Sequence, residues 1–212
     1  MPSSLSTLET LVRKGLGGRD DSAADTVIGA CINYAILLAA ILFEPPELLI
    51  ANNVTVSANS NNANISTYLA DQLDVKGVWN NTGSFKMWYI PWEVWETIVP
   101  ANVGAVKYFT TFGDKIYVKD TPSANTVLAV SRSTYPSDVS NGNDTIGFDH
   151  HDSFIVSTAI TIARAFFEKA DVGKAMDTIT LPLTLSAKAR QIIEGRKSGL
   201  NEALMQGVGS QP

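Results

Sequence analysis

Cysteine, histidine and clusters of positive charge are all scarce in this chain of 212 residues. The single cysteine, Cys31, excludes an internal disulfide, and its place within an apolar stretch indicates a small core residue in a reducing compartment. The net charge is −5 and no run of Lys or Arg occurs. A sequence-independent grip on a phosphate backbone needs several cations on one face, so a DNA-binding role is not expected.

Recognisable metal-binding and catalytic patterns are also missing. The two histidines are neighbours, His150 and His151, followed by Asp152. Consecutive helical residues point about 100° apart, whereas helical metal ligands lie three or four positions apart. The chain has no Gly-x-Ser-x-Gly elbow and no glycine-rich phosphate loop. We therefore predict no metal site, no cofactor and no enzyme, and an enzyme ranks last among the alternatives.

What the chain does contain is apolar sequence. Hydrophobic residues make up 45% and charged residues 17%, so we expect other subunits to cover part of the surface. The longest apolar stretch, 27–43, is at the lower edge of a membrane span. It contains Asn33 and lacks flanking Lys/Arg asymmetry or an aromatic belt. The pattern favours a buried helix that packs in its own core and against a neighbouring subunit, with a membrane anchor as an alternative.

Periodicity and capping signals predict helices towards both ends of the chain and strands between them. The first helix, opened by Ser6 with Glu9, is expected to be a loosely held arm, and Ser22 with Asp25 and Asp149 with Asp152 open two others. The predicted helices are 4–16, 22–43, 92–99, 149–173 and 186–205. The predicted strands are 48–57, 68–79, 85–90, 106–112, 115–119 and 126–135. Loops are expected at 59–64 and 137–145, and extended chain at 178–185.

This order predicts an α+β fold, in which helices from the two ends form a bundle and a large β-rich insertion, sandwich-like or barrel-like, lies between them. The predicted boundaries are a discontinuous helical domain, 1–47 with 148–206, and an insertion, 48–147. Residues 207–212 are predicted to form a flexible C-terminal tail.

Aromatic residues gather in one short segment of the predicted insertion. The favoured interpretation is that Trp88, Trp92 and Trp95 pack where the insertion meets the helices, because each buries a large area. The alternative is a stacking platform for sugar rings, as in a carbohydrate-binding or adhesion β-module on a helical stalk. Stacking on nucleic acid is disfavoured without interleaved Arg or Lys. The segment's aromatic residues are Trp79, Phe85, Trp88, Tyr89, Trp92 and Trp95.

The order of elements resembles a known family, the head-to-tail adaptor (connector, or tail tubular) proteins of tailed, particularly short-tailed, bacteriophages. The resemblance extends over residues 30–205. It rests on an apolar helix ending at a Pro-containing turn, a short Tyr-x-Pro helical segment and a Phe-Gly-Asp-Lys-Ile-Tyr-Val hairpin. A strand ending in Tyr-Pro, an acidic loop, a helix opening near His-Asp and a final helix complete it. The corresponding segments are 32–46, 89–99, 112–118, 128–136, 138–144, 150–169 and 186–205.

The resemblance implies a non-enzymatic ring, commonly of twelve copies, at the head-tail junction of the virion. Such a ring docks under the portal protein, completes the DNA-filled head and offers a platform for the tail nozzle protein. Double-stranded DNA passes through it without specific binding. Assembly takes place in the cytoplasm of the host bacterium, with no membrane contact.

The resemblance also suggests which residues meet which partner. The final helix and tail, 186–212, should reach the portal, and the β-rich insertion should face the tail. The portal-binding candidates are Lys188, Arg190, Arg196, Lys197, Leu200 and Leu204. A ring also needs helices that are apolar on two sides. The subunit-interface candidates are therefore Ile28, Ile32, Ile36, Ile155, Ile162 and Phe166.

Overall fold

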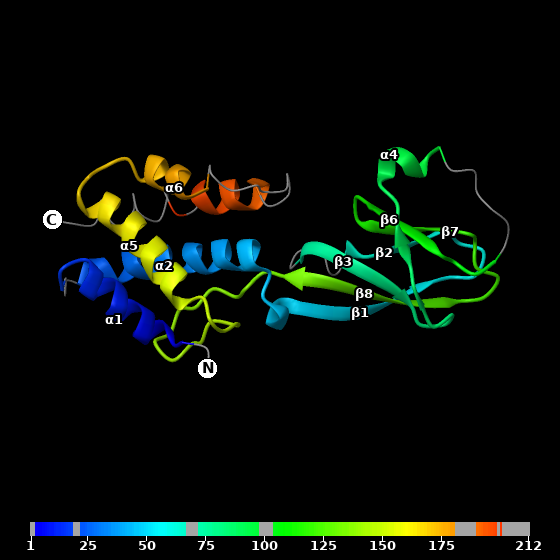
Figure 1. The fold of residues 1–212 in the computed structure, drawn as a ribbon, viewed down its shortest axis with the longest axis horizontal. Helices are drawn as coiled ribbons and strands as arrows, with labels where there is room; N and C mark the ends of the chain where they lie inside the picture. The colour runs from blue at the N-terminus through cyan, green and yellow to red at the C-terminus, as the bar shows by residue number, and fades with distance from the viewer. Residues whose placement is uncertain are drawn as a thin grey trace. The chain divides into compact units, whose positions relative to one another are not determined.

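The computed structural model describes residues 3–18, 22–66, 72–97, 104–180, 190–198 and 200. The fold is mixed α+β, as predicted, and the chain divides into two compact units. Unit 1 comprises Met1–Leu48 with Pro136–Pro212, and unit 2 comprises Leu49–Tyr135. Residues 136–147, placed with the insertion by the sequence analysis, fall in unit 1 (Figure 1).

Unit 1 is helical. The 22-residue helix α2 packs against α1 and α5, and α6 packs against α5. Its core is made mainly by α2, where Ile28, Ile32 and Leu38 have no exposed surface. The described helical elements are α1 (Leu5–Gly15), α2 (Ser22–Phe43), the 3₁₀ turn η1 (Pro46–Leu48), α5 (Asp152–Phe167), α6 (Val172–Thr180) and the segment 190–198.

Helix α1 differs from the predicted loose arm. Its N-cap is Ser4, not Ser6, and the Ser4 side chain accepts from the backbone N–H of Thr7. Leu8 and Val12 are fully buried, because the apolar row of this helix faces α2 and α5. Its first turn is also tied to the acidic loop, since the Leu5 N–H donates to the Asp144 carbonyl at 2.8 Å.

Helix α5 is shorter than predicted at both ends. It begins at Asp152 with His151 as its N-cap, and no side chain caps it, so the predicted cap at Asp149 is wrong. It ends at Phe167, and Lys169 then adopts a positive φ of 55°. The chain turns there into α6, whose last three residues fall in the segment 178–185 that was predicted to be extended. The missed signal is Asp171, whose side chain accepts from the backbone N–H of Lys174 and caps the new helix.

Unit 2 contains two four-stranded sheets among its described residues. The first sheet has the order β1-β8-β3-β4 and is antiparallel throughout. The second has the order β2-β7-β6-β5, in which β5 and β6 run parallel. The strands are β1 (Leu49–Val56), β2 (Asn62–Asn64), β3 (Gln72–Asn80), β4 (Phe85–Lys86), β5 (Trp88–Tyr89), β6 (Tyr108–Phe112), β7 (Lys115–Lys119) and β8 (Thr126–Thr134).

Two features of unit 2 correct the predicted strands. The Asn-rich tract predicted as a loop contains β2, which pairs with β7. The strand predicted at 85–90 is two short strands in different sheets, and the chain crosses from the first sheet to the second at the buried Met87. The predicted hairpin at Gly113 is present, and Gly113 has the positive φ of 58° that such a turn requires.

One hydrophobic cluster takes buried residues from both sheets of unit 2. Alternation along the strands places these residues on one face of each sheet, and the short helix α4 (Trp92–Trp95) packs near β6. The cluster comprises Val54, Val56, Ile65, Val78, Met87, Val106, Phe109, Ile116, Val118, Leu128 and Val130.

Candidate interaction surfaces

The residues predicted to form the subunit interface lie inside unit 1. Ile28, Ile32, Ile155 and Ile162 have no exposed surface and Ile36 is 2% exposed, while Phe166 is half-buried. Their side chains pack within the same chain, because α2 is enclosed by the helices around it. A subunit interface that left this core intact would have to use other side chains.

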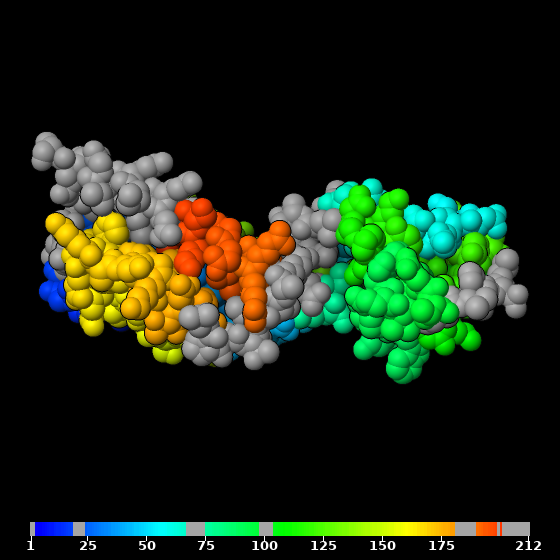
Figure 2. Space-filling view, turned by 90° about the horizontal axis from the view of Figure 1, so that it is seen from above, coloured from blue at the N-terminus to red at the C-terminus, as the bar shows by residue number. Residues whose placement is uncertain are grey.

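The C-terminal helical segment 190–198 carries most of the predicted portal-binding residues that the structure describes. Ile193, which the sequence analysis did not single out, and Leu200 are buried in unit 1 and anchor the segment. Arg190 is exposed, and no ion pair is recorded for it among the described residues. Lys188 and Leu204 lie outside the described residues. In Figure 2 this segment and α6, coloured in orange shades, lie on the same face of unit 1.

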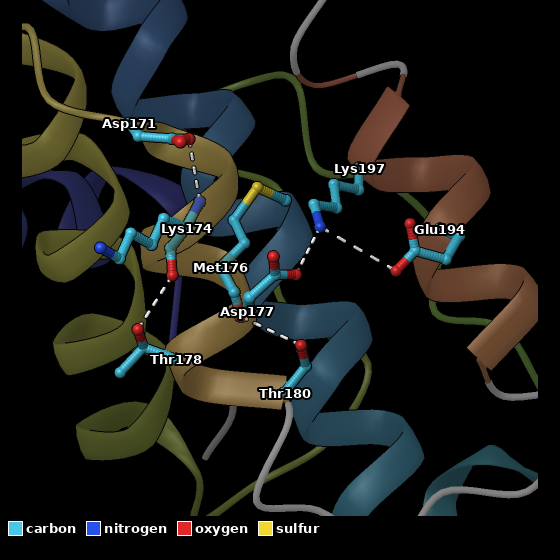
Figure 3. Close-up of polar contacts among 8 residues, drawn as sticks. All are labelled: Asp171, Lys174, Met176, Asp177, Thr178, Thr180, Glu194 and Lys197. Atoms are coloured by element: carbon cyan, nitrogen blue, oxygen red, sulfur yellow. Dashed lines mark hydrogen bonds and ion pairs between the residues drawn. The ribbon is translucent and has the colours of Figure 1, made fainter.

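The two other predicted cations are paired within the chain. Arg196 lies 2.8 Å from Asp138 of the acidic loop, and both side chains are about half exposed. Figure 3 shows the Lys197 ammonium between two carboxylates, 2.5 Å from Asp177 on α6 and 4.0 Å from Glu194. Lys197 is 17% exposed, so this contact is the more enclosed of the two. Both cations therefore hold the segment to unit 1.

Tyr34 of α2 lies beneath this segment. Its hydroxyl is buried and makes no hydrogen bond to the described residues. Burial raises the pKa of Tyr34 well above its usual range, and the nearby carboxylates of Glu194 and Asp177 add to the shift. A cavity of about 320 Å³ adjoins it and is lined by Ala30, Asn33, Tyr34, Asp138, Gly195, Arg196 and Leu200.

The predicted apolar helix α2 also contains the cysteine. Cys31 is fully buried, and this burial raises the pKa of its thiol to about 12. Among the described residues one segment, Ala24–Phe43 of α2, is long and apolar enough to cross a membrane. Most of that segment, 61%, is buried inside the chain, and the core helix of a water-soluble fold has the same character.

The two histidines lie beside α5 and do not converge with other metal ligands. The ring of His151 stacks on Phe43 with centroids 4.3 Å apart, and it also contacts Phe148. His150 has a positive φ of 70°. Across the described part of the chain, no group of three His, Cys, Asp or Glu side chains lies close enough to hold a metal ion.

Unit 2 presents an aromatic face on the outer side of its second sheet. On β6 and β7, Phe109, Ile116 and Val118 point into the hydrophobic cluster, so the residues that alternate with them point outward. Trp88 lies directly opposite Tyr108 and shares that outer face. Trp88 is 72% exposed, Phe112 55% and Tyr108 39%.

Helix α4 covers the end of this aromatic face at Phe112. Trp92 stacks on Phe112 with centroids 4.4 Å apart and contacts Tyr117 at 5.2 Å. Trp95 is buried, and the Lys119 ammonium lies 4.8 Å from the centre of its ring. Figure 2 shows α4 and its neighbours, in green, on the visible surface of unit 2. Of the predicted junction aromatics, Trp95 is therefore buried within unit 2 and Trp92 is half-buried, whereas Trp88 is largely exposed.

No protein-family model matches the chain, and no curated protein matches it. Unit 1 offers the face of the 190–198 segment, and unit 2 offers the aromatic face and the open edges of its sheets.

Proposed function

We propose that the chain is a structural adaptor at the head-tail junction of a tailed bacteriophage. In this proposal, copies of the chain form a ring, of twelve subunits by analogy with the family, beneath the portal protein. The ring completes the DNA-filled head, receives the tail nozzle protein and surrounds the path of the double-stranded DNA. The helices of unit 1 would form the adaptor's bundle, and unit 2 its β-rich, sandwich-like or barrel-like insertion.

The observation that carries this proposal is the order of elements. Two helical parts of one unit are separated in sequence by a β-rich unit, which contains the 112–118 hairpin on which the resemblance rests. The exposed aromatic face adds support, because aromatic residues are enriched at the centres of protein interfaces. The net charge of −5 also suits a channel through which DNA slides without sticking.

The first test is the mass of the purified chain in detergent-free buffer over a range of concentrations, with negative-stain images of any assembly. The proposal expects closed rings with a central hole wide enough for duplex DNA, formed by the chain alone or on its portal. A chain that needs detergent, or that neither forms rings nor binds the portal ring of its own phage, would contradict the proposal.

Portal docking is best tested on the exposed surface of the 190–198 segment. Deletion of 186–212 would remove Ile193 and Leu200 from the core of unit 1, so lost docking could reflect unfolding. The substitution Arg190→Glu changes an exposed charge and leaves that core intact. We expect it to weaken binding to portal rings, whereas the control Lys14→Glu, at an exposed position of α1, should not.

A second candidate function is carbohydrate binding, favoured by the 72% exposure of Trp88 beside Tyr108 and Phe112. Titration with soluble bacterial surface oligosaccharides would then change the tryptophan fluorescence. Trp88→Ala should abolish the change, and Trp79→Ala, on the other sheet, should leave it. No response to any of the sugars would reject this alternative.

A further inference from the structure

The longest open strand edge among the described residues belongs to β1. This eight-residue strand is an outer strand of the first sheet and is hydrogen-bonded on one side, to β8. The other outer strands, β2, β4 and β5, have three, two and two residues. An open edge presents a row of backbone N–H and C=O groups that another strand can pair with.

The pairing of β8 identifies which β1 groups point outward. The Val127 N–H donates to the Thr82 hydroxyl, and the Val127 carbonyl accepts from the Asn81 N–H. Both groups of Val127 therefore point away from β1, and so its partner Thr55 directs its own N–H and C=O away from β8. The β1 register is regular from Leu49 to Val56, so the groups that point outward belong to alternate residues. These residues are Leu49, Ala51, Asn53 and Thr55.

Nothing in the composition of this edge protects it from pairing. Monomeric proteins protect long outer strands with charged residues, Pro or bulges. The segment 49–57 has no charged residue, Pro or Gly, and its pairing with β8 contains no bulge. A cavity of about 530 Å³ lies beside the edge, bounded by β1, β2 and Lys115. Thr55 and Asn53 are exposed there.

We propose that this open edge of β1 pairs with a strand of a second copy of the chain, and so forms part of the contact between neighbouring subunits. The inference rests on the proposed function, because it assumes that copies of the chain assemble with one another. A second copy is the occupant that this edge favours, because the segment 49–57 has no charge to pair with a charged peptide and has none of the features that keep copies of a chain apart. Among the residues that line the adjoining cavity, only Lys115 is charged. The low proportion of charged residues in the whole chain agrees with surface covered by other copies.

The test uses the full chain and the variant Thr55→Pro, with Thr55→Ala as the matched control. Both variants lose the hydroxyl, but Pro also removes the outward N–H, and Pro is tolerated where that N–H faces away from the ladder. We expect Thr55→Pro to raise the concentration needed for assembly about two- to tenfold, as the loss of about one hydrogen bond per contact predicts, and Thr55→Ala to leave it nearly unchanged. Circular dichroism and the Tm would show that both variants are folded.

Amide hydrogen exchange provides a measurement that needs no variant. On assembly, the amides of Ala51, Asn53 and Thr55 should become protected, while those of Asn52 and Val54, already bonded to β8, are slow in both states. Exchange is carried out on the assembled chain, which is then dissociated and analysed by NMR. If the outward amides exchange at monomer rates in the assembly, or Thr55→Pro assembles like Thr55→Ala, the inference is wrong although a ring exists.

Two other outcomes would also overturn it. One is protection of these amides by a different protein when no ring of copies forms. The other is a wild-type chain that forms no ring, either alone or on portal rings. In that last case portal docking still decides the adaptor function separately, so failure of the edge contact and failure of the function remain distinguishable.

Discussion

The two units of this chain differ in how much of their apolar surface they bury. Unit 1 encloses it, since α2 is surrounded by other helices and Ile28, Ile32 and Ile36 are buried. Unit 2 leaves much of it exposed, with Trp88, Phe112 and Tyr108 on one sheet face and a long uncharged strand at an open edge. The more apolar helical sequence is thus the less available for contacts with partners. The difference directs the search for partners to unit 2, and to the exposed surface of the 190–198 segment in unit 1.

The largest expected effect comes from making the same substitution in each unit. Ile155→Ala removes a fully buried side chain of unit 1 and should cost about 2–5 kcal/mol of its unfolding free energy. Ile50→Ala, at a position 39% exposed on β1, should cost less than about 1 kcal/mol.

The chain provides a separate probe for each unit in a urea unfolding series. Cys31 is buried in unit 1 and its thiol pKa is about 12, so it should react with thiol reagents when that unit unfolds. All four tryptophans are in unit 2, so their fluorescence follows that unit. Equal losses for the two variants would contradict the contrast between the enclosed and the exposed apolar residues.

Sequence patterns predicted the α+β class, the bounds of α2 and the hairpin at Gly113, because long periodic segments and turn residues are local signals. The sequence patterns did not distinguish a helix face that packs against another subunit from one that packs against its own chain. The isoleucines of α2 and α5 have the same sequence character in either case, and the tertiary packing around them decides it. The aromatic face was found as a cluster in sequence, but its exposure depends on the pairing of Trp88 with Tyr108.

The ion pairs of the 190–198 segment have a smaller expected effect. Lys197→Met should destabilise unit 1 by about 1 kcal/mol, because Asp177 and Glu194 lose a cation that is 17% exposed. Arg196→Met breaks a half-exposed pair and should cost a few tenths, roughly the value for a surface ion pair. Limited proteolysis and Cys31 reactivity would measure both variants. If Arg196→Met released the segment more readily, the ranking by burial would be wrong.

The smallest effect concerns pH and the acidic loop at the start of α1. The Asp144 carboxylate accepts the backbone N–H groups of Asn141 at 2.8 Å and Ser140 at 2.9 Å, which lowers the pKa of Asp144. Asp144 therefore contributes fully to stability above the pKa that it has in the unfolded chain. This contribution is lost as the pH falls through the lower pKa that Asp144 has in the folded chain. The contribution of Tyr34 to stability changes with pH in the opposite direction, because its pKa is raised in the folded chain and stability is lost as the pH rises.

An NMR titration of the Ser140 and Asn141 amides would test the acidic half of this contrast. In the wild type both signals should shift with a midpoint below the ordinary value for Asp. Asp144→Asn should abolish that midpoint. Because the Asp144 carbonyl also accepts the Leu5 N–H, the Leu5 amide should lose protection in acid, measured as its exchange rate relative to the intrinsic rate at the same pH, whereas the protection of the β1 amides should not change. A midpoint at the ordinary value would show that these hydrogen bonds do not favour the carboxylate, and that the loop does not couple α1 to pH.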